Sequence, residues 1–334
     1  MKLASNISLI SAIKFLTSFN SRRKLTAIKC GGTMIKDFGE MLESVKHNTL
    51  KTIVIAAAHS ESALEAAIMA YKRNLARCIL VGDQNYIKKY FLENAPKLRE
   101  EFEIIDCGDN LQAASEKSVL LIREGKGDLL MKGACDSGIL LTAILDRHKG
   151  LRTRNIMSDV LAYEIKGKIM LMGDGGFIPL PEIRDKLSII SNCVRVAHAL
   201  GNFRPKVALL AHTEKVNLKN QSTVDAAILT KMYHRGQITG CVLDGPLAFD
   251  VAICKEAAQI KGLTSEVAGN ADILIVPNIE AGNIFGKCLT YYCQFRVAHV
   301  VLGAKVPVLI ASRADSAETK MLTMALGIIT TGVN

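Results

Sequence analysis

Short apolar runs alternate with amphipathic stretches along the chain from Met34 to residue 147. The runs are rich in Val, Ile and Leu, as buried strands are, and apolar residues recur at helical spacing between them. The expected strands are 52–58, 78–82, 102–107 and 128–133, and the expected helices are 35–45, 61–73, 83–92, 111–123 and 139–147. This alternation predicts an α/β fold with a parallel sheet that helices cover on both faces.

The pattern changes after residue 147. The basic segment 148–155 breaks the periodicity, which predicts a crossing between two domains. Two strand-like runs follow back to back and are joined by Lys166-Gly167, which predicts a hairpin that a purely parallel sheet would not contain. The alternation then resumes, with expected strands at 207–212, 241–246, 272–278, 298–303 and 306–311 and expected helices at 181–200, 223–234, 250–261, 279–292 and from 321 onward.

Composition narrows the possible partners. The chain has 334 residues, enough for two domains, and its hydrophobic content of 49% predicts well-filled cores. The net charge is +10, but residues 1–33 hold six basic residues and no acid, so the remainder carries only +4. That charge is too mild for a nucleic-acid surface, and the chain has no Trp for base stacking. We therefore expect no nucleic-acid partner and an enzyme that handles anionic substrates.

Residues 1–33 differ from the rest of the chain. They are rich in Ser and basic residues, and Lys14 interrupts their apolar run, which is too short to span a bilayer. The composition fits an organellar transit peptide, a misassigned start or a simple extension equally well. We expect a cytoplasmic protein with no membrane partner, and the sequence leaves organellar targeting open.

The cysteines and histidines predict no metal site. Nine cysteines form no C-x-x-C pair, and several lie in apolar runs, as Cys78 and Cys241 do. We expect them to be small buried residues in a reducing compartment. The seven histidines form no H-E-x-x-H motif and no Cys/His cluster, so neither a structural nor a catalytic metal is expected.

The segment 306–320 is a candidate site. An apolar strand ends at Ala311 and a dense polar cluster follows, beginning with Ser312 and Arg313. Ligands bind outside the carboxyl ends of strands in open α/β sheets. Helix capping by Ser312 with Asp315, or by Asp315 with Glu318, is the alternative. Capping does not explain Arg313, because the helix dipole disfavours a cation at a helix start.

Two further segments carry candidate residues. In 277–287, Asn283 and Lys287 stand four apart on one helix face, beside a stripe that Gly282 and Gly286 leave bare. Close helix packing or an anion site would each explain why glycine stands at both positions. In 244–250, Asp244 follows a strand and Asp250 precedes a helix, which fits either substrate binding or a turn and a cap.

A dinucleotide site is weakly supported. The Gly-rich run 172–177 follows a strand, but Ile178 stands where the third glycine of the fingerprint would be. The chain also contains no P-loop and no G-x-S-x-G motif.

Several blocks together resemble the phosphate acetyltransferase/butyryltransferase family, and its butyryl branch most of all. They are LMKG (130–133), KGLRT (149–153), VAHALG (196–201), TVDAAILTKM (223–232), RGQITGCVLDGPLAFD (235–250), EVAGNADILIVPNIEAGN (266–283) and VPVLIASRADSAETKM (306–321). The resemblance implies a homodimer of chains with two α/β domains of the isocitrate/isopropylmalate dehydrogenase-like type and an active site in the cleft between them. The implied divisions are an N-terminal extension at 1–33, domain I at 34–147 and 300–334, and domain II at 148–299.

The resemblance also implies the chemistry, a reversible transfer of a short acyl group between coenzyme A and inorganic phosphate. It places Ser312 near the thiol and Arg313 at the developing charge. Asn283, Lys287 and Ser137 are then assigned to phosphate, with Asp244 also among the substrate-binding candidates. Coenzyme A is a substrate, and neither a cofactor nor a metal is implied.

Three positions depart from the acetyl-specific pattern of the family. Thr319 stands where those members carry an Asp proposed as the base, which leaves Asp315 or Glu318 as substitutes. Thr142 replaces an Arg and Ile178 replaces an Asn. The first two departures favour a phosphate butyryltransferase. The alternatives are an acetyl-CoA enzyme, a decarboxylating dehydrogenase of the same fold, and a coenzyme A-binding member with little activity.

Overall fold

A computed structural model describes residues 34–332, so the predicted N-terminal extension at 1–33 lies outside the described part of the chain. The first elements alternate as expected, and most bounds agree within two or three residues. They are α2 (Phe38–Lys46), β1 (Lys51–Ala56), α3 (Glu61–Lys72), β2 (Ala76–Gly82), α4 (Gln84–Asn94), a 3₁₀ helix (Pro96–Glu101), β3 (Glu103–Asp106), α5 (Leu111–Arg123), β4 (Leu129–Lys132) and α6 (Ser137–Leu145).

The later elements include the predicted hairpin. They are β5 (Ser158–Ile165), β6 (Lys168–Gly173), α7 (Ile183–Ala199), β7 (Lys206–Leu210), α8 (Gln221–His234), β8 (Val242–Leu247), α9 (Phe249–Ile253), α10 (Lys255–Ile260), β9 (Ile273–Ile275), α11 (Ile279–Lys287), a π-helical turn (Cys288–Tyr292), β10 (Val297–Leu302), β11 (Val308–Leu309) and α12 (Ala317–Ile329). One prediction is wrong: the helix expected at 250–261 is two helices, because Cys254 between them is extended.

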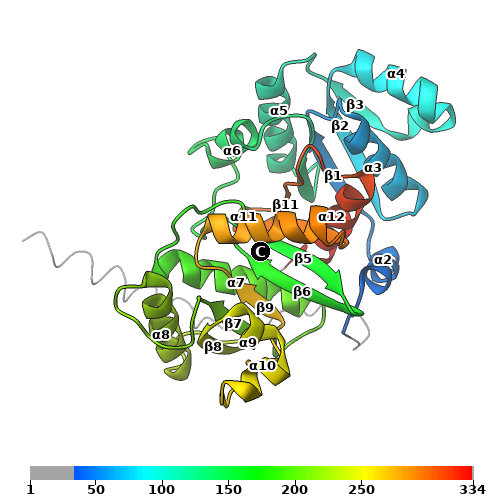
Figure 1. Cartoon of the computed structure of the whole chain (residues 1–334). Coiled ribbons are helices and arrows are strands. Elements are labelled where there is room, and N and C mark those ends of the chain that lie inside the picture. The colour runs from blue at the N-terminus through cyan, green and yellow to red at the C-terminus, as the bar shows by residue number, and fades with distance from the viewer. Residues whose placement is uncertain (1–33, 333–334) are drawn as a thin grey trace, which may run out of the picture.

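The strands form one sheet in the order β3-β2-β1-β4-β11-β10-β5-β6-β9-β7-β8. Its two ends are parallel, as predicted, and Figure 1 shows β1–β3 in the upper part and β6–β9 in the lower part. The middle is different, since β10 is antiparallel to both β11 and β5, and β5 is antiparallel to β6. The C-terminal segment therefore returns to the centre of the sheet, and β11 pairs with β4.

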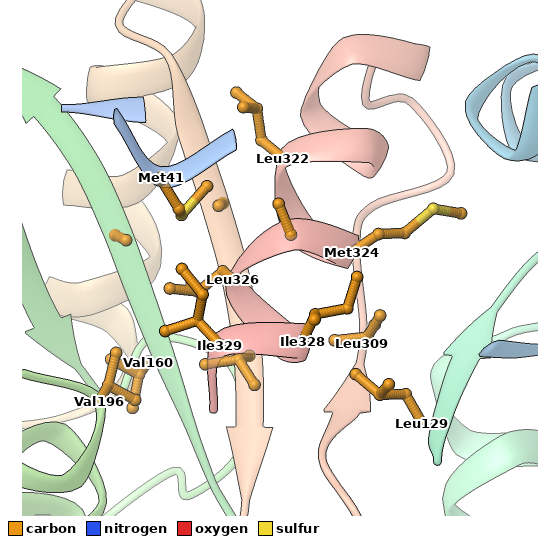
Figure 2. Packing of buried hydrophobic residues seen from close by; sticks show 14 of the residues in the cluster. Met41, Leu129, Val160, Val196, Leu309, Leu322, Met324, Leu326, Ile328 and Ile329 are labelled. Carbon is orange, nitrogen blue, oxygen red and sulfur yellow. The ribbon is translucent and has the colours of Figure 1, made fainter. Parts of the chain in front are cut away.

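The helix α12 fills the centre of the fold. All of its residues except Glu318 and Thr319 are buried, as expected of a helix that is apolar on every side. Figure 2 shows its side chains near Leu309 and Leu129 on one side and near Val160 and Val196 on the other. This packing joins strands from both ends of the sheet and holds the turn that precedes α12 in a defined place.

The expectation that the cysteines are buried holds for some of them. Among the eight described cysteines, four are buried as expected, whereas Cys288, at the start of the π-helical turn, and Cys293, directly after it, are exposed. Within residues 34–332, no helix is long and apolar enough to cross a membrane. The division into domains stays a prediction.

Candidate functional site

A cavity of about 480 Å³ opens at the centre of the sheet. Its lining comes from the end of β4 with the start of α6, from β5, β6 and β10, from α11, and from the turn after β11. Six of the predicted site residues line it: Ser137, Asn283, Lys287, Ser312, Arg313 and Asp315. Segments that are far apart in sequence thus bring most of the predicted candidates to one cavity.

The turn after β11 is built around Asp315. Its Oδ2 accepts a hydrogen bond from the Ser312 backbone N–H at 2.7 Å, and the buried Lys320 Nζ donates to the Ser312 and Asp315 carbonyl oxygens. The cap of α12 is Ser316, whose Oγ accepts from the Thr319 N–H, so neither capping scheme expected from the sequence is correct. Ser312 and Arg313 are consequently left to face the cavity.

Arg313 joins this turn to the start of α6. One guanidinium nitrogen lies 3.0 Å from Asp136 Oδ1, and both side chains are more than half exposed. Asp136 is the N-cap residue of α6, and Ser137 is the first helical residue. The ends of β4 and β11 therefore present a guanidinium, a carboxylate and a hydroxyl group on the same side of the cavity.

The two glycines of α11, Gly282 and Gly286, serve different purposes. A Cβ on Gly282 would lie 2.7 Å from the Gly175 Cα, so this glycine permits close packing of the helix on the loop after β6. A Cβ on Gly286 would meet only Leu161 at 3.4 Å and Met172 at 3.9 Å, so Gly286 leaves space in the cavity. Close packing, one of the two alternatives weighed from the sequence, is therefore correct for Gly282, and the anion site stays a prediction.

The polar candidates of α11 lie at the edge of the cavity. The Asn283 amide donates to the Gly175 carbonyl oxygen at 3.3 Å, which orients it toward the loop after β6. The Lys287 ammonium lies 5.3 Å from the centroid of the Tyr291 ring. Both side chains are exposed, so they are accessible to an anionic group in the cavity.

Two of the predicted site residues, Asp244 and Glu318, do not line the cavity. Asp244 lies within β8, where its Oδ1 accepts from the neighbouring Gly245 N–H. Glu318 accepts from Arg296 on the surface of α12 and does not reach the cavity. Asp250 does not cap α9; it pairs with Lys261. The structure therefore offers no contact that would give Asp244 or Glu318 a role at this cavity.

The loop after β6 is organised by a carboxylate and not by a nucleotide-binding turn. Asp174 accepts hydrogen bonds from the backbone N–H groups of Gly176, Phe177 and Ile178. Burial, with the charge of Asp159 as a second cause, raises the pKa of Asp174 to about 7 despite these bonds. Ile178 packs against the core and does not line the cavity. Thr142 and Thr319 also lie outside the lining.

Sequence reasoning missed four titratable groups that line the cavity: Asp136, described above, and Lys132, Asp159 and His299 of the strands. Lys132 is buried at the end of β4, and this burial, aided by Arg313, lowers its pKa. His299 Nδ1 lies 3.1 Å from Asp159 Oδ2. The only sequence signal was the presence of polar residues inside apolar strands. Within residues 34–332, no group of three His, Cys, Asp or Glu side chains is arranged to hold a metal ion.

Known proteins resemble the chain along nearly its whole length. Residues 37–119 and 109–328 match the family described as phosphate acetyl/butaryl transferase. A phosphate butyryltransferase of Clostridium acetobutylicum is 42% identical over 301 residues, which cover 90% of this chain and 99% of that protein. A phosphate acetyltransferase of Thermotoga maritima is 39% identical over 294 residues, 87% of this chain and 99% of that protein.

A solved structure resembles the chain in fold as well as in sequence. The branched-chain phosphotransacylase of Enterococcus faecalis superposes with a TM-score of 0.75 at 29% identity and covers 84% of this chain and 99% of that one. The predicted α/β fold class and the resemblance to the phosphate acyltransferases are confirmed.

Proposed function

The chain belongs to the phosphate acetyl/butaryl transferase family, and on that premise we propose that it transfers a butyryl group between coenzyme A and inorganic phosphate. The runner-up is the same transfer with an acetyl group, since phosphate acetyltransferases are also among the relatives. The observation that carries the proposal is the single cavity that gathers Ser137, Asn283, Lys287, Ser312 and Arg313.

The lining supplies what an acyl transfer to phosphate requires. Phosphate needs cationic and N–H donors, and the start of α6 beside Ser137 offers both a hydroxyl group and unpaired helix N–H groups. Lys287 and Asn283 approach from the opposite helix. We assign Arg313 to the oxyanion of the tetrahedral intermediate, which demands preorganised donors. Ser312 would then lie near the thiol sulfur.

The acyl chain is assigned to the apolar part of the cavity. Leu161 and Met172 form a floor on adjacent strands, and Gly286 of α11 lies above it with no side chain. Such a space accommodates methylene groups, each of which contributes about 0.8 kcal/mol when buried. A site of this kind favours butyryl over acetyl, in line with the departures at Thr319 and Thr142.

The test is an assay of thiol release from acyl-CoA in the presence of phosphate, over chain lengths from acetyl to valeryl. We expect kcat/KM to be highest for butyryl-CoA. Absence of release with every substrate would overturn the enzymatic proposal, and a maximum at acetyl-CoA would replace the butyryl assignment with the runner-up.

Gly286→Ala is expected to shift this preference toward acetyl-CoA. The added methyl group makes ordinary contacts with Leu161 and Met172, so it fills the apolar space without displacing the helix. The lost room should lower kcat/KM for butyryl-CoA about 10-fold or more relative to acetyl-CoA, the scale for one methylene in a hydrophobic pocket. The ratio of the two kcat/KM values measures this effect, and an unchanged ratio would place the acyl chain elsewhere.

Assembly and location follow the family resemblance and remain proposals. We propose a cytoplasmic homodimer that uses coenzyme A as a substrate and needs no further cofactor. The proposed domain I comprises residues 34–147 and 300–334, and domain II residues 148–299. Light scattering of the purified protein would measure the mass, and a monomer would contradict the proposed assembly.

A further inference from the structure

His299 and Asp159 lie on one face of the sheet and line the cavity. His299 of β10 pairs with Leu161 of β5, and Asp159 is two residues from Leu161 on the same strand. Side chains two residues apart on a strand share a face, so the two groups are diagonal neighbours. The His299 Nδ1 lies 3.1 Å and 3.4 Å from the two oxygens of Asp159. This arrangement fixes the plane of the imidazole ring.

The other ring nitrogen faces the cavity. A carboxylate only accepts hydrogen bonds, so Nδ1 carries the proton in the neutral ring and Nε2 carries the lone pair. No residue within 34–332 donates a hydrogen bond to Nε2 or accepts one from it. In the same range, every fully buried polar atom of a side chain that is not itself exposed has a hydrogen-bond partner, so Nε2 is not fully buried. Nε2 is therefore accessible to a molecule in the cavity, and 24% of the His299 side chain is exposed.

We propose that His299 is the general base that takes the thiol proton of coenzyme A, and that Asp159 positions it. The inference rests on the acyl transfer proposed above, and it identifies the general base that this reaction requires. The S–H bond breaks as its proton moves to Nε2, and the sulfur electron pair forms the new C–S bond with the acyl phosphate carbonyl carbon. The carbonyl π pair moves to oxygen and then returns as the C–O bond to phosphate breaks with its electron pair on phosphate. The departing phosphate takes the proton from the imidazolium, which restores the neutral ring. In the reverse direction, the imidazolium returns the proton to the departing thiolate.

The remaining carboxylates of the cavity are less suited to this role. Asp315 already accepts the Ser312 N–H, and its 8% exposed surface leaves it little access. Asp136 pairs with Arg313. The histidine alone combines an accessible lone pair with an orienting partner, the arrangement by which a base and its third group act together in other enzymes.

The charges around His299 come from three elements besides its own strand. Burial disfavours the charged ring, but Asp159 of β5 outweighs it through charge and a hydrogen bond. Asp315 of the turn adds to this effect and Lys287 of α11 opposes it, and the pKa of His299 is raised as a result. The raised pKa lies closer to that of a thiol, about 8.5, which eases proton transfer between them.

The experiment compares His299→Asn with His234→Asn, an exposed histidine on α8 outside the cavity. With butyryl phosphate and coenzyme A, we expect His299→Asn to lower kcat by about 10²–10⁴ with little change in KM. His234→Asn should match the wild type. Added imidazole should restore part of the activity of His299→Ala, which a purely structural role would not allow. The proposal would be overturned if imidazole did not rescue His299→Ala and the kcat of His299→Asn were within threefold of the wild type.

The pH profile separates the base from its partner. In the wild type, kcat/KM should rise with pH through the pKa of His299, because only the neutral ring accepts a proton. Asp159→Asn removes the group that raises this pKa, so the rise should move to lower pH while kcat falls. In His299→Asn, the rise should move up toward the pKa of the thiol. A rise at the same pH in all three proteins would overturn the assignment.

The two proposals fail in distinguishable ways. A wild-type protein that releases no thiol with any acyl-CoA overturns the acyl transfer and this inference together. An active wild type with an equally active His299→Asn overturns only the assignment of the base.

Discussion

Arg313→Ala is expected to lower kcat for butyryl-CoA and phosphate about 10²–10³-fold, the loss that follows removal of one oxyanion donor. Arg313 lies in the turn after β11 and pairs with Asp136 at the start of α6. Its charge is needed mainly when the carbonyl oxygen becomes negative, so kcat should fall more than the affinity for either substrate. The thiol-release assay measures both quantities.

Two matched variants distinguish the charge from the geometry. Arg313→Lys keeps a cation but loses the planar pair of donors, so it should recover only a small part of the activity. Asp136→Asn removes the ion pair and leaves Arg313 in place, and its effect should be much smaller. Thermal unfolding should hardly change in any of the three, because an exposed ion pair contributes little to stability. A kcat for Arg313→Ala within threefold of the wild type would remove Arg313 from the reaction.

Local signals in the sequence predicted most of the fold. The apolar runs and the helical spacing are properties of consecutive residues, and Lys166-Gly167 marks its hairpin without reference to the rest of the chain. The central position of β10 was not predicted. Packing between distant segments places β10 between β11 and β5. Parallel and antiparallel pairing leave the same hydrophobic pattern in a fully buried strand, so the sequence does not distinguish them.

The difference between local signals and long-range packing also explains which site residues the sequence predicted. Ser312 and Arg313 stand in a dense polar cluster at a strand end, which a sequence displays directly. Asn283 and Lys287 stand four apart on one helix face, which is also a local pattern. His299 and Asp159 are single polar residues in two apolar strands and are 140 positions apart. Only the register of β10 on β5 brings them together, so no local pattern predicts the pair. Asp315 and Glu318 were the bases suggested by neighbouring sequence, and the hydrogen bonds of the fold occupy both.

The two glycines of α11 provide the sharpest contrast between two substitutions of the same kind. In an exposed helix interior, Gly→Ala stabilises by about 1 kcal/mol. Gly286→Ala should gain part of this, since its methyl group meets Leu161 at an ordinary 3.4 Å. Gly282→Ala should instead destabilise the protein, because its methyl group would overlap the Gly175 Cα at 2.7 Å and the Asp174 carbonyl oxygen at 2.9 Å. Backbone atoms cannot move aside as a flexible side chain can.

The overlap at Gly282 should cost about 1–3 kcal/mol, the usual range for overpacking, and should force α11 away from the loop after β6. Asn283 and Lys287 would move with the helix, and a displacement near 1 Å can cost about 10²-fold in rate. Chemical denaturation and the thiol-release assay should therefore show Gly282→Ala losing both stability and turnover with every acyl-CoA. Gly286→Ala should lose only its preference for longer chains. Equal stability of the two variants would mean that α11 does not depend on the contact between Gly282 and Gly175, and that other packing holds Asn283 and Lys287 in place.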